Sequence, residues 1–182
     1  MLHNRLQLLD HPPFRDAVAD VTFSLKSGFF IEVETGMARI KLDLPANFPF
    51  TTELRVRITD INYGGHLGND ALLGLLHEAR VRFLAHYGLS ELEIGGAGLI
   101  MTDSVIVYKS EAFPGETLVI AVGVTDFARH GCDFIYQVTE QASGREVARA
   151  KTGFVFFDYP QRTVQRVPQL FLDLFARDAV PA

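Results

Sequence analysis

A short polar stretch in the first half of the chain carries the side chains best suited to chemistry. Asp60, Asn62 and His66 stand close together, and the glycines Gly64 and Gly65 separate the amide from the imidazole. The residues after them are mostly apolar and predict a helix. A strand that ends at polar groups and turns through glycine into a helix N-terminus presents backbone N–H groups and a positive dipole end. We therefore expect this junction to hold a carbonyl oxygen or an anion.

Two regular elements must position this junction. Residues 52–60 alternate between apolar and polar side chains, which predicts a strand with one buried face. Beyond the turn, Asn69 or Asp70 is a favourable N-cap for a helix. That helix is expected to run to about Tyr87 and to stop at Gly88, because glycine is common just past helix ends.

The predicted helix is apolar around much of its circumference. Leucine, alanine and phenylalanine recur at the 3.6-residue spacing of one helix face, and two further leucines widen that face. So wide an apolar arc predicts a helix that is largely enclosed by other structure. The face comprises Leu72, Leu75, Leu76, Ala79 and Phe83, widened by Leu73 and Leu84.

Four strand-like segments come after the helix, beyond a glycine-rich loop at residues 89–98. Their connections contain Pro-Gly, His-Gly and Ser-Gly pairs, which suit hairpin turns. One helix and then a long antiparallel meander predict an α+β fold in which a curved sheet wraps around the helix. The domain is expected at 51–182, with a short amphipathic helix at about 169–177. The predicted strands are Leu99–Tyr108, Thr117–Phe127, Cys132–Thr139 and Glu146–Asp158.

The N-terminal region, residues 1–50, is expected to form an arm in front of this domain. Within it, residues 22–33 and 37–44 have β character and predict a hairpin. A different hypothesis treats residues 1–36 as a non-native extension, because Met37 would be a sensible first residue for the domain. Mass spectrometry of the protein from its native host decides between the two.

The composition excludes several classes of protein. The 182 residues are 48% hydrophobic and 21% charged, which fits one globular domain with a sizeable core. The formal net charge is −5 and no cluster of Lys or Arg stands out, so we expect no nucleic-acid partner. The single cysteine, Cys132, excludes an internal disulfide and favours a reducing cytoplasm. We expect no metal site, and no apolar window approaches the roughly 18 residues of a membrane span.

The motif at the junction is Asp-x-Asn-x-x-Gly-His-x-x-Asn, and His-Glu-Ala-Arg comes next on the predicted helix. This pattern resembles that of the hot-dog fold acyl-CoA thioesterases of the 4-hydroxybenzoyl-CoA thioesterase-like superfamily. The segments Tyr108–Leu118 and Phe154–Asp158 resemble the same family and occur in the same order. The resemblance covers about residues 51–168. It implies a hot-dog fold, with one long central helix wrapped by a curved antiparallel sheet of five or six strands.

The chain departs from the family pattern at three positions. The family motif has a second Asp, the catalytic carboxylate in many members, where this chain has Asn62. Gly68 replaces the first residue of an Asn-Asn pair, and Leu72 replaces an aromatic residue on the helix. The change at Asn62 bears directly on catalysis, because an amide does not titrate and so cannot serve as a base.

The resemblance implies hydrolysis of a thioester of coenzyme A or of acyl-carrier protein. It implies no cofactor beyond the coenzyme A of the substrate itself. Family members pair into homodimers and often homotetramers, with the site at the dimer interface. Two other functions stay open. One is a non-catalytic acyl-thioester binding protein, suggested by Asn62. The other, ranked last, is a hydratase or dehydratase, because the same fold hosts these enzymes but the chain lacks their longer insertion.

Thioester hydrolysis requires a polarised carbonyl, a positioned water and a base or nucleophile. Gly64 and Gly65 let the backbone approach the ligand. The N–H groups of Gly65 and His66 are expected to point at the carbonyl oxygen, helped by the helix dipole. His66 is the favoured base, and Asn62 is expected to orient a water or the substrate.

A carboxylate is the remaining member of the expected site. Glu78 on the helix is the favoured carboxylate, acting in a pocket at a dimer interface. Either Asp60 or Glu78 is expected to fix the tautomer of His66. Tyr108 and Asn69 complete the expected substrate-binding residues.

Most of these residues also have a purely structural interpretation. Asp60 at a strand end can equally bond nearby N–H groups, and Asn62 can tolerate a left-handed backbone. Asn69 is more often an N-cap than a substrate ligand. Glu78 stands four residues before Arg82, so a helix ion pair is as well founded as catalysis.

Overall fold

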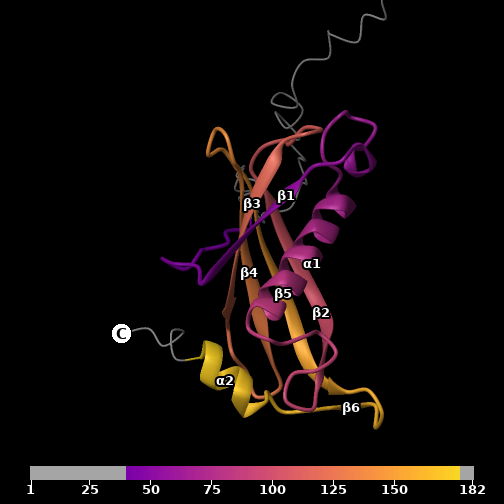
Figure 1. The fold of residues 1–182 in the computed structure, drawn as a ribbon, viewed down its shortest axis with the longest axis vertical. Helices are drawn as coiled ribbons and strands as arrows, with labels where there is room; N and C mark the ends of the chain where they lie inside the picture. The colour runs from indigo at the N-terminus through magenta and orange to yellow at the C-terminus, as the bar shows by residue number, and fades with distance from the viewer. Residues whose placement is uncertain (1–39, 177–182) are drawn as a thin grey trace, which may run out of the picture. The chain divides into compact units, whose positions relative to one another are not determined.

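Six antiparallel strands and two helices make up the part of the chain that the computed structural model describes, residues 40–176 (Figure 1). The helices are α1 (Asn69–His86) and α2 (Gln169–Phe175), and a short 3-10 turn covers Ile58–Asp60. The strands are β1 (Phe50–Arg55), β2 (Gly98–Tyr108), β3 (Thr117–Thr125), β4 (Gly131–Glu140), β5 (Glu146–Asp158) and β6 (Thr163–Val164). The predicted α+β class, with one long helix on an antiparallel sheet, is confirmed.

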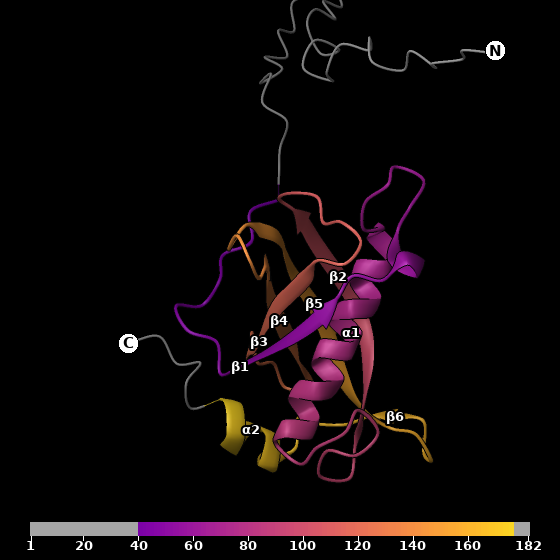
Figure 2. The ribbon, with the colours of Figure 1, turned by 45° about the horizontal axis from the view of Figure 1, so that its top comes forward.

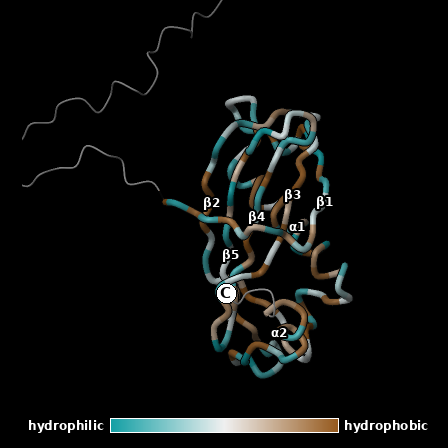
Figure 3. The backbone as a smooth tube through the Cα atoms, turned by 90° about the vertical axis from the view of Figure 1, so that its left-hand side faces the viewer, coloured by the Kyte–Doolittle hydropathy of each residue, from teal (hydrophilic) through white to brown (hydrophobic). Residues whose placement is uncertain are grey.

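The sheet has the strand order β1-β3-β4-β5-β2, and the short β6 pairs with β5. All of these pairings are antiparallel. The helix α1 lies along one face of the curved sheet (Figure 2). Hydropathy varies from residue to residue along the strands (Figure 3), as expected when successive side chains point to opposite faces. The strands β3, β4 and β5 form a meander, but β2 pairs with β5 and not with β3, so the hairpin predicted between β2 and β3 is wrong. The sheet as a whole gives α1 a broad apolar surface to pack on.

The later elements match their sequence predictions. The four strands β2 to β5 begin and end within two residues of the predicted bounds. The helix α2 falls within the helix predicted at about 169–177. Neither α1 nor α2 is long and apolar enough to cross a lipid bilayer.

The first strand differs from its prediction. It ends at Arg55, so the strand predicted at 52–60 is wrong over its second half. There the Asp60 carboxylate accepts the backbone N–H of Arg57 at 2.8 Å, and the chain bends into the 3-10 turn. Alternation alone could not show this, because the apolar residues of the bend keep the period of a strand.

One face of α1 is buried and the opposite face is exposed. Seven of its 18 residues are buried, and they include all five residues of the predicted apolar face. Leu73, expected to widen that face, is only partly buried, while Gly74, His77 and Glu78 are exposed. Within residues 40–176 the sheet thus covers one side of the helix and does not surround it.

The helix begins after a glycine and not at a side-chain cap. Gly68 is the N-cap residue, with an extended backbone and no capping side chain, so the predicted cap at Asn69 or Asp70 is wrong. The Gly68 N–H donates to the Asp60 backbone oxygen at 2.8 Å, which draws the next two residues into the first turn. At the other end Gly88 stands just past the helix with φ of +73°, as predicted.

Aromatic rings form the centre of the core beneath α1. Phe83 is fully buried, and its ring centroid lies 5.7 Å from that of Phe50 and 5.9 Å from that of Phe134. Phe175 of α2 lies 5.1 Å from Phe83 and 4.8 Å from Tyr87, measured between ring centroids. The C-terminal helix therefore closes the core at the end of α1.

One arginine is buried beside this core. The Arg80 guanidinium donates to Glu91 Oε1 at 2.6 Å and to the Tyr136 hydroxyl at 3.3 Å, and its central carbon lies 4.4 Å from the ring centroid of Phe154. The second oxygen of Glu91 lies 2.9 Å from His77 Nε2. A buried charge is tolerated when it is paired and hydrogen-bonded. This network joins α1 to the loop after it and to β4.

Residues 40–49 run over the face of the sheet opposite to α1 without forming a strand. Arg149 of β5 donates from Nη1 to the Leu42 backbone oxygen at 3.2 Å. A Cβ built on Gly123 of β3 would lie 3.5 Å from the Phe48 ring. The segment therefore packs on the surface of the sheet and does not extend its edge.

The strand predicted for residues 37–44 is wrong in its described part, 40–44. Alternation alone could not exclude this, because Ile40 keeps the period of a strand although its side chain is exposed. The rest of the predicted hairpin lies outside the described residues. So does the segment that the hypothesis of a non-native extension concerns, residues 1–36.

Replacing Phe83 by Ala is expected to lower the free energy of unfolding by about 3–5 kcal/mol, because loss of a ring at the centre of the core leaves a cavity. Urea denaturation followed by circular dichroism measures this change. Val81→Ala, on the exposed face of α1, is the control and should stay within about 0.5 kcal/mol of the wild type. Equal losses in the two variants would contradict the central place of this ring.

Candidate active site

A tight turn connects the 3-10 turn to α1. The Gly65 N–H donates to the Asn62 backbone oxygen at 3.1 Å, and the Gly64 N–H donates to Asn62 Oδ1 at 2.8 Å. The Asn62 N–H donates to the His66 backbone oxygen at 2.9 Å and closes the base of the turn. Gly65 has φ of +81°, a conformation that glycine adopts without strain. The amide and the glycines together specify the shape of this turn.

The turn determines which N–H groups can polarise a carbonyl. The Gly65 N–H is bonded to Asn62, so the expectation that it points at a substrate carbonyl is wrong. Within residues 40–176 the N–H groups of His66 and Asn69 have no hydrogen-bond partner. The first N–H groups of a helix lack intrahelical acceptors and carry the positive end of its dipole. The free N–H of Asn69 therefore lies at the start of α1, and the free N–H of His66 lies at the end of the turn before it.

Asp60 stabilises the chain just before this turn through its bonds to Arg57. Its carboxylate accepts two bonds from the Arg57 guanidinium, at 3.0 and 3.2 Å, and one from the Arg57 N–H. The guanidinium bond holds the pKa of the Asp60 carboxyl below its usual value, against the opposing effect of burial. The structure shows no bond between Asp60 and His66 in the described residues. Asp60 therefore matches its structural interpretation and does not fix the imidazole.

A pocket of about 290 Å³ opens beside the N-terminus of α1. The turn and the first part of α1 form one side, and the end of β2 with the loop after it forms the other. Of the predicted site residues, the pocket brings together His66, Asn69 and Tyr108. The residues that line it are His66, Leu67, Asn69, Leu72, Tyr108, Lys109, Ser110, Glu111, Ala112 and Val147.

His66 is the best-connected polar side chain of this pocket. Its Nδ1 lies 3.4 Å from Asn62 Nδ2 and 3.2 Å from the Leu67 backbone oxygen. Its Nε2 lies 3.8 Å from Glu111 Oε1. The two Nδ1 contacts require different protonation states, because an amide nitrogen only donates and a carbonyl oxygen only accepts.

The surroundings of His66 favour a proton on Nε2. The Asn62 amide has its orientation set by the Gly64 N–H bond to Oδ1, so its Nδ2 must face the ring. A proton on Nε2 also faces the Glu111 carboxylate, whereas a lone pair there would be repelled by it. We therefore assign the neutral ring with Nδ1 as acceptor and Nε2–H as donor. In this tautomer the Nε2–H of His66 is a donor toward the pocket, and the role of His66 as the base stays a prediction.

Glu111 is a titratable pocket residue that the sequence predictions miss. Its loop is tied to the turn of His66, since the Leu67 N–H donates to the Ala112 backbone oxygen at 2.8 Å. The residue does stand within the Tyr108–Leu118 segment that resembles the family. A carboxylate in a loop has no periodicity to show which way it faces, so this signal could not single it out.

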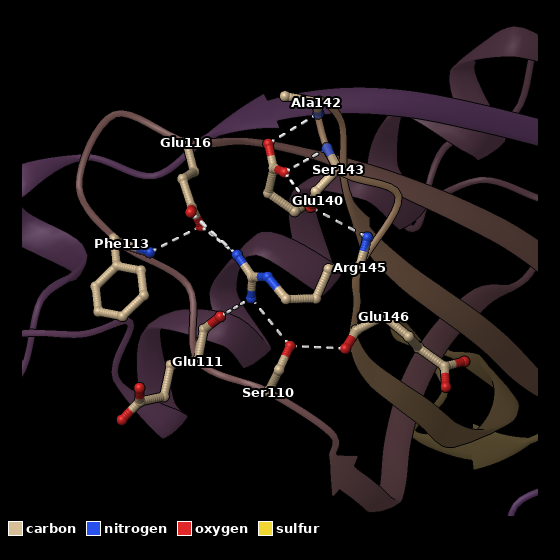
Figure 4. Close-up of polar contacts among 9 residues, drawn as sticks. All are labelled: Ser110, Glu111, Phe113, Glu116, Glu140, Ala142, Ser143, Arg145 and Glu146. Atoms are coloured by element: carbon tan, nitrogen blue, oxygen red, sulfur yellow. Dashed lines mark hydrogen bonds and ion pairs between the residues drawn. The ribbon is translucent and has the colours of Figure 1, made fainter.

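Arg145 holds the loop of Glu111 in place (Figure 4). Its Nη2 lies 3.0 Å from both carboxylate oxygens of Glu116, and its Nη1 donates to Ser110 Oγ at 3.0 Å and to the Glu111 backbone oxygen. Glu116 also accepts the Phe113 N–H at 3.0 Å. The Glu111 side chain points away from the guanidinium. Arg145 thus fixes the backbone of this residue and leaves its carboxylate free.

Glu78, the favoured carboxylate of the sequence prediction, does not line the pocket. It is half-exposed on α1 and accepts from Arg82 Nε at 2.8 Å. Arg82 also donates to Thr52 Oγ1 and to the Glu53 backbone oxygen. Within one chain Glu78 forms the helix ion pair with Arg82 and lies outside the pocket. A catalytic role for Glu78 would require a pocket completed by a second chain.

Tyr108 stands at the end of β2, with its side chain half-exposed at the pocket. Burial, together with the charge of Asp70, raises the pKa of its phenol above the usual value. The hydroxyl is therefore protonated at neutral pH and can donate a hydrogen bond to a substrate.

Metal ligation and a reactive thiol are two further kinds of chemistry that side chains can support. Residues 40–176 contain no group of three or more His, Cys, Asp or Glu side chains placed to hold a metal ion. Cys132 is buried, and burial raises the pKa of its thiol. Such a thiol is a packing residue and a poor nucleophile.

The known proteins that this chain resembles are thioesterases or hydrolases of coenzyme A thioesters. The sequence model of the thioesterase-like superfamily matches residues 56–175. A 1,4-dihydroxy-2-naphthoyl-CoA hydrolase from Synechocystis is 26% identical over 123 residues, or 66% of this chain and 89% of that protein. The solved 1,4-dihydroxy-2-naphthoyl-CoA thioesterase from Synechocystis has a TM-score of 0.63 and 25% identity, covering 70% of this chain and 95% of its own. A gentisyl-coenzyme A thioesterase has a TM-score of 0.62 at 16% identity, covering 69% and 99%, and shares the fold.

The bond between Asp60 and Arg57 predicts a pH-dependent stability. Because the pKa of Asp60 is lowered in the folded chain, its ionised form stabilises the fold above the unfolded pKa, and this stabilisation is lost as the pH falls through the folded pKa. The Asp60→Asn variant should therefore lose less free energy of unfolding than the wild type between about pH 6 and about pH 3. Urea denaturation at both pH values measures this, with Asp173→Asn on the exposed face of α2 as control. Identical pH dependence in wild type and Asp60→Asn would contradict it.

Proposed function

We propose that this chain, which belongs to the thioesterase-like superfamily, hydrolyses acyl-CoA thioesters to a free acid and a free thiol. The observation that carries the proposal is the pocket beside the N-terminus of α1. His66 and free N–H groups meet there with the apolar surface of Leu72 and Val147. A relative with 26% identity is named as the hydrolase of an aromatic acyl-CoA, and a solved thioesterase with 25% identity shares the fold.

The pocket suggests how a thioester would be held. The acyl group enters between α1 and the end of β2, and its carbonyl oxygen faces the start of the helix. The N–H groups of His66 and Asn69 then stabilise the negative charge that develops on this oxygen. Tyr108 supplies a hydroxyl donor from the opposite side. The coenzyme A arm, or the arm of an acyl-carrier protein, extends from the pocket mouth into solvent.

A non-catalytic acyl-thioester binding protein is the second candidate. The observation in its favour is Asn62, an amide where the family motif has an acid. Its Oδ1 is already bonded to Gly64 and its Nδ2 faces His66, so it organises the site without supplying a base. Tight binding of an acyl-CoA in calorimetry without any turnover would favour this candidate.

The proposal includes a homodimer or homotetramer in the cytoplasm, with no nucleic-acid partner. The strand β2 is last in the strand order, so its outer edge has no partner strand along most of its length in the described sheet. Such an edge favours pairing with a second copy. The buried single cysteine suits a reducing compartment, which fractionation of the native host tests. Sedimentation should give two or four times the 20.3 kDa of one chain, and a monomer would contradict the assembly.

The purified protein is expected to release free thiol from at least one acyl-CoA in a panel of short, long and aromatic acyl groups. A thiol-reactive dye measures the rate. Because the proposal needs no metal or other cofactor, the rate should survive extensive treatment with a chelator. If no thioester of coenzyme A or of acyl-carrier protein is cleaved, the enzyme proposal fails.

Gly64→Ala ties this activity to the turn. The new Cβ would lie 2.9 Å from His66 Nε2 and 3.1 Å from Asn62 Oδ1, so the imidazole must move while the backbone, which is not in the left-handed region, stays. We expect a fall in kcat of about 10-fold or more at unchanged melting temperature. Gly74→Ala on α1 is the matched control, because a Cβ there meets no atom within 4 Å. Equal rates in both variants would place the activity elsewhere.

A further inference from the structure

We infer that Glu111 is the general base of this pocket, the carboxylate that takes a proton from the attacking water. This role rests on the proposed thioester hydrolysis and names a catalytic residue for it. Neither the motif at the turn nor the favoured helix carboxylate points to this residue, which lies in the loop after β2.

The position of Glu111 is set by two contacts. The backbone bond from Leu67 to Ala112, 2.8 Å long, joins its loop directly to the turn that carries His66. Glu111 Oε1 lies 3.8 Å from His66 Nε2, and both residues line the pocket. This separation is longer than a direct hydrogen bond, so the carboxylate keeps lone pairs free for a water molecule.

The Glu111 carboxylate also has fewer bonding partners than the other carboxylates near the pocket. Asp60, Glu78 and Glu116 each bond to an arginine guanidinium. A guanidinium partner occupies carboxylate lone pairs that a base needs to accept a proton from water. The Glu111 side chain has no hydrogen bond and pairs with His66 alone among residues 40–176. The remaining cationic groups around it are Lys109 in the pocket wall and Arg145, which bonds to its backbone oxygen.

Two neighbours determine where Glu111 lies: one bonds to its backbone and the other faces its carboxylate. The Arg145 guanidinium bonds to the Ser110 and Glu116 side chains and to the Glu111 backbone oxygen, as Figure 4 shows. On the pocket side, the Nε2–H of His66 faces the carboxylate, because the Asn62 amide occupies Nδ1. His66 and Asn62 are therefore positioning residues for the base. The family motif has an acid where this chain has Asn62, and Glu111 supplies a carboxylate on the opposite side of the His66 ring.

The chemical step balances with these groups. The Glu111 carboxylate accepts a proton from water as the water oxygen bonds to the thioester carbonyl carbon. The carbonyl oxygen takes up the negative charge and faces the N–H groups at the start of α1. The carbonyl re-forms as the C–S bond breaks, and the proton passes from Glu111 to the leaving thiolate. The products are a carboxylic acid and a thiol, and Glu111 is again ionised.

The test compares Glu111→Gln with the wild type on the best acyl-CoA of the panel. We expect kcat to fall about 100-fold or more with KM within about threefold, because only the base is removed. Asp173→Asn, which removes an exposed carboxylate of α2, is the matched control and should keep the full rate. Because the Glu111 side chain is 63% exposed, the variant should fold, and circular dichroism checks this.

The variant Glu78→Gln tests the competing hypothesis, in which Glu78 is the catalytic carboxylate. A loss of rate confined to Glu78→Gln gives the carboxylate role to α1 and overturns the inference. So does a folded Glu111→Gln variant that keeps a rate within about threefold of the wild type. A wild type that cleaves no thioester overturns the hydrolysis proposal itself, so the two failures are distinguishable.

Discussion

The burial of one face of α1 against the sheet is the constraint on which the rest of the structure depends. The apolar face packs on a core of aromatic rings, and Arg80 joins the same helix to Glu91 and Tyr136. This packing places the N-terminus of α1 beside the end of β2. The free N–H groups of the first turn and the pocket therefore arise from packing far from any reacting atom.

The pocket is assembled from two segments that are distant in sequence. The turn at 62–66 shapes itself through its own amide and glycines, and a single backbone bond from Leu67 to Ala112 attaches it to the loop after β2. Arg145, which directly precedes β5, stabilises that loop through its bonds to Glu116. Each segment is ordered by short-range bonds, and their juxtaposition is ordered by the register of the sheet.

The sequence predicted regular elements well where one physical rule acted alone. The strands of the meander and the apolar face of α1 could be read from side-chain period, since burial on one face selects it. The prediction failed where a local bond overrode the period. Asp60 bonded to Arg57 ends β1 early, and Gly68 bonded to Asp60 displaces the expected cap. Both errors lie next to the site, where polar side chains compete with secondary structure for backbone groups.

The amino-acid sequence by itself determined the fold class, the helix that carries the site and the turn with Asn62 and His66, because each depends on neighbours a few residues apart. The tertiary structure alone decided which polar groups share a pocket. It brought Glu111 to His66 and left Glu78 with Arg82, although the sequence favoured the second carboxylate. The reason is that a loop side chain acquires its partners only when strand register brings remote segments together, and no local spacing records that register.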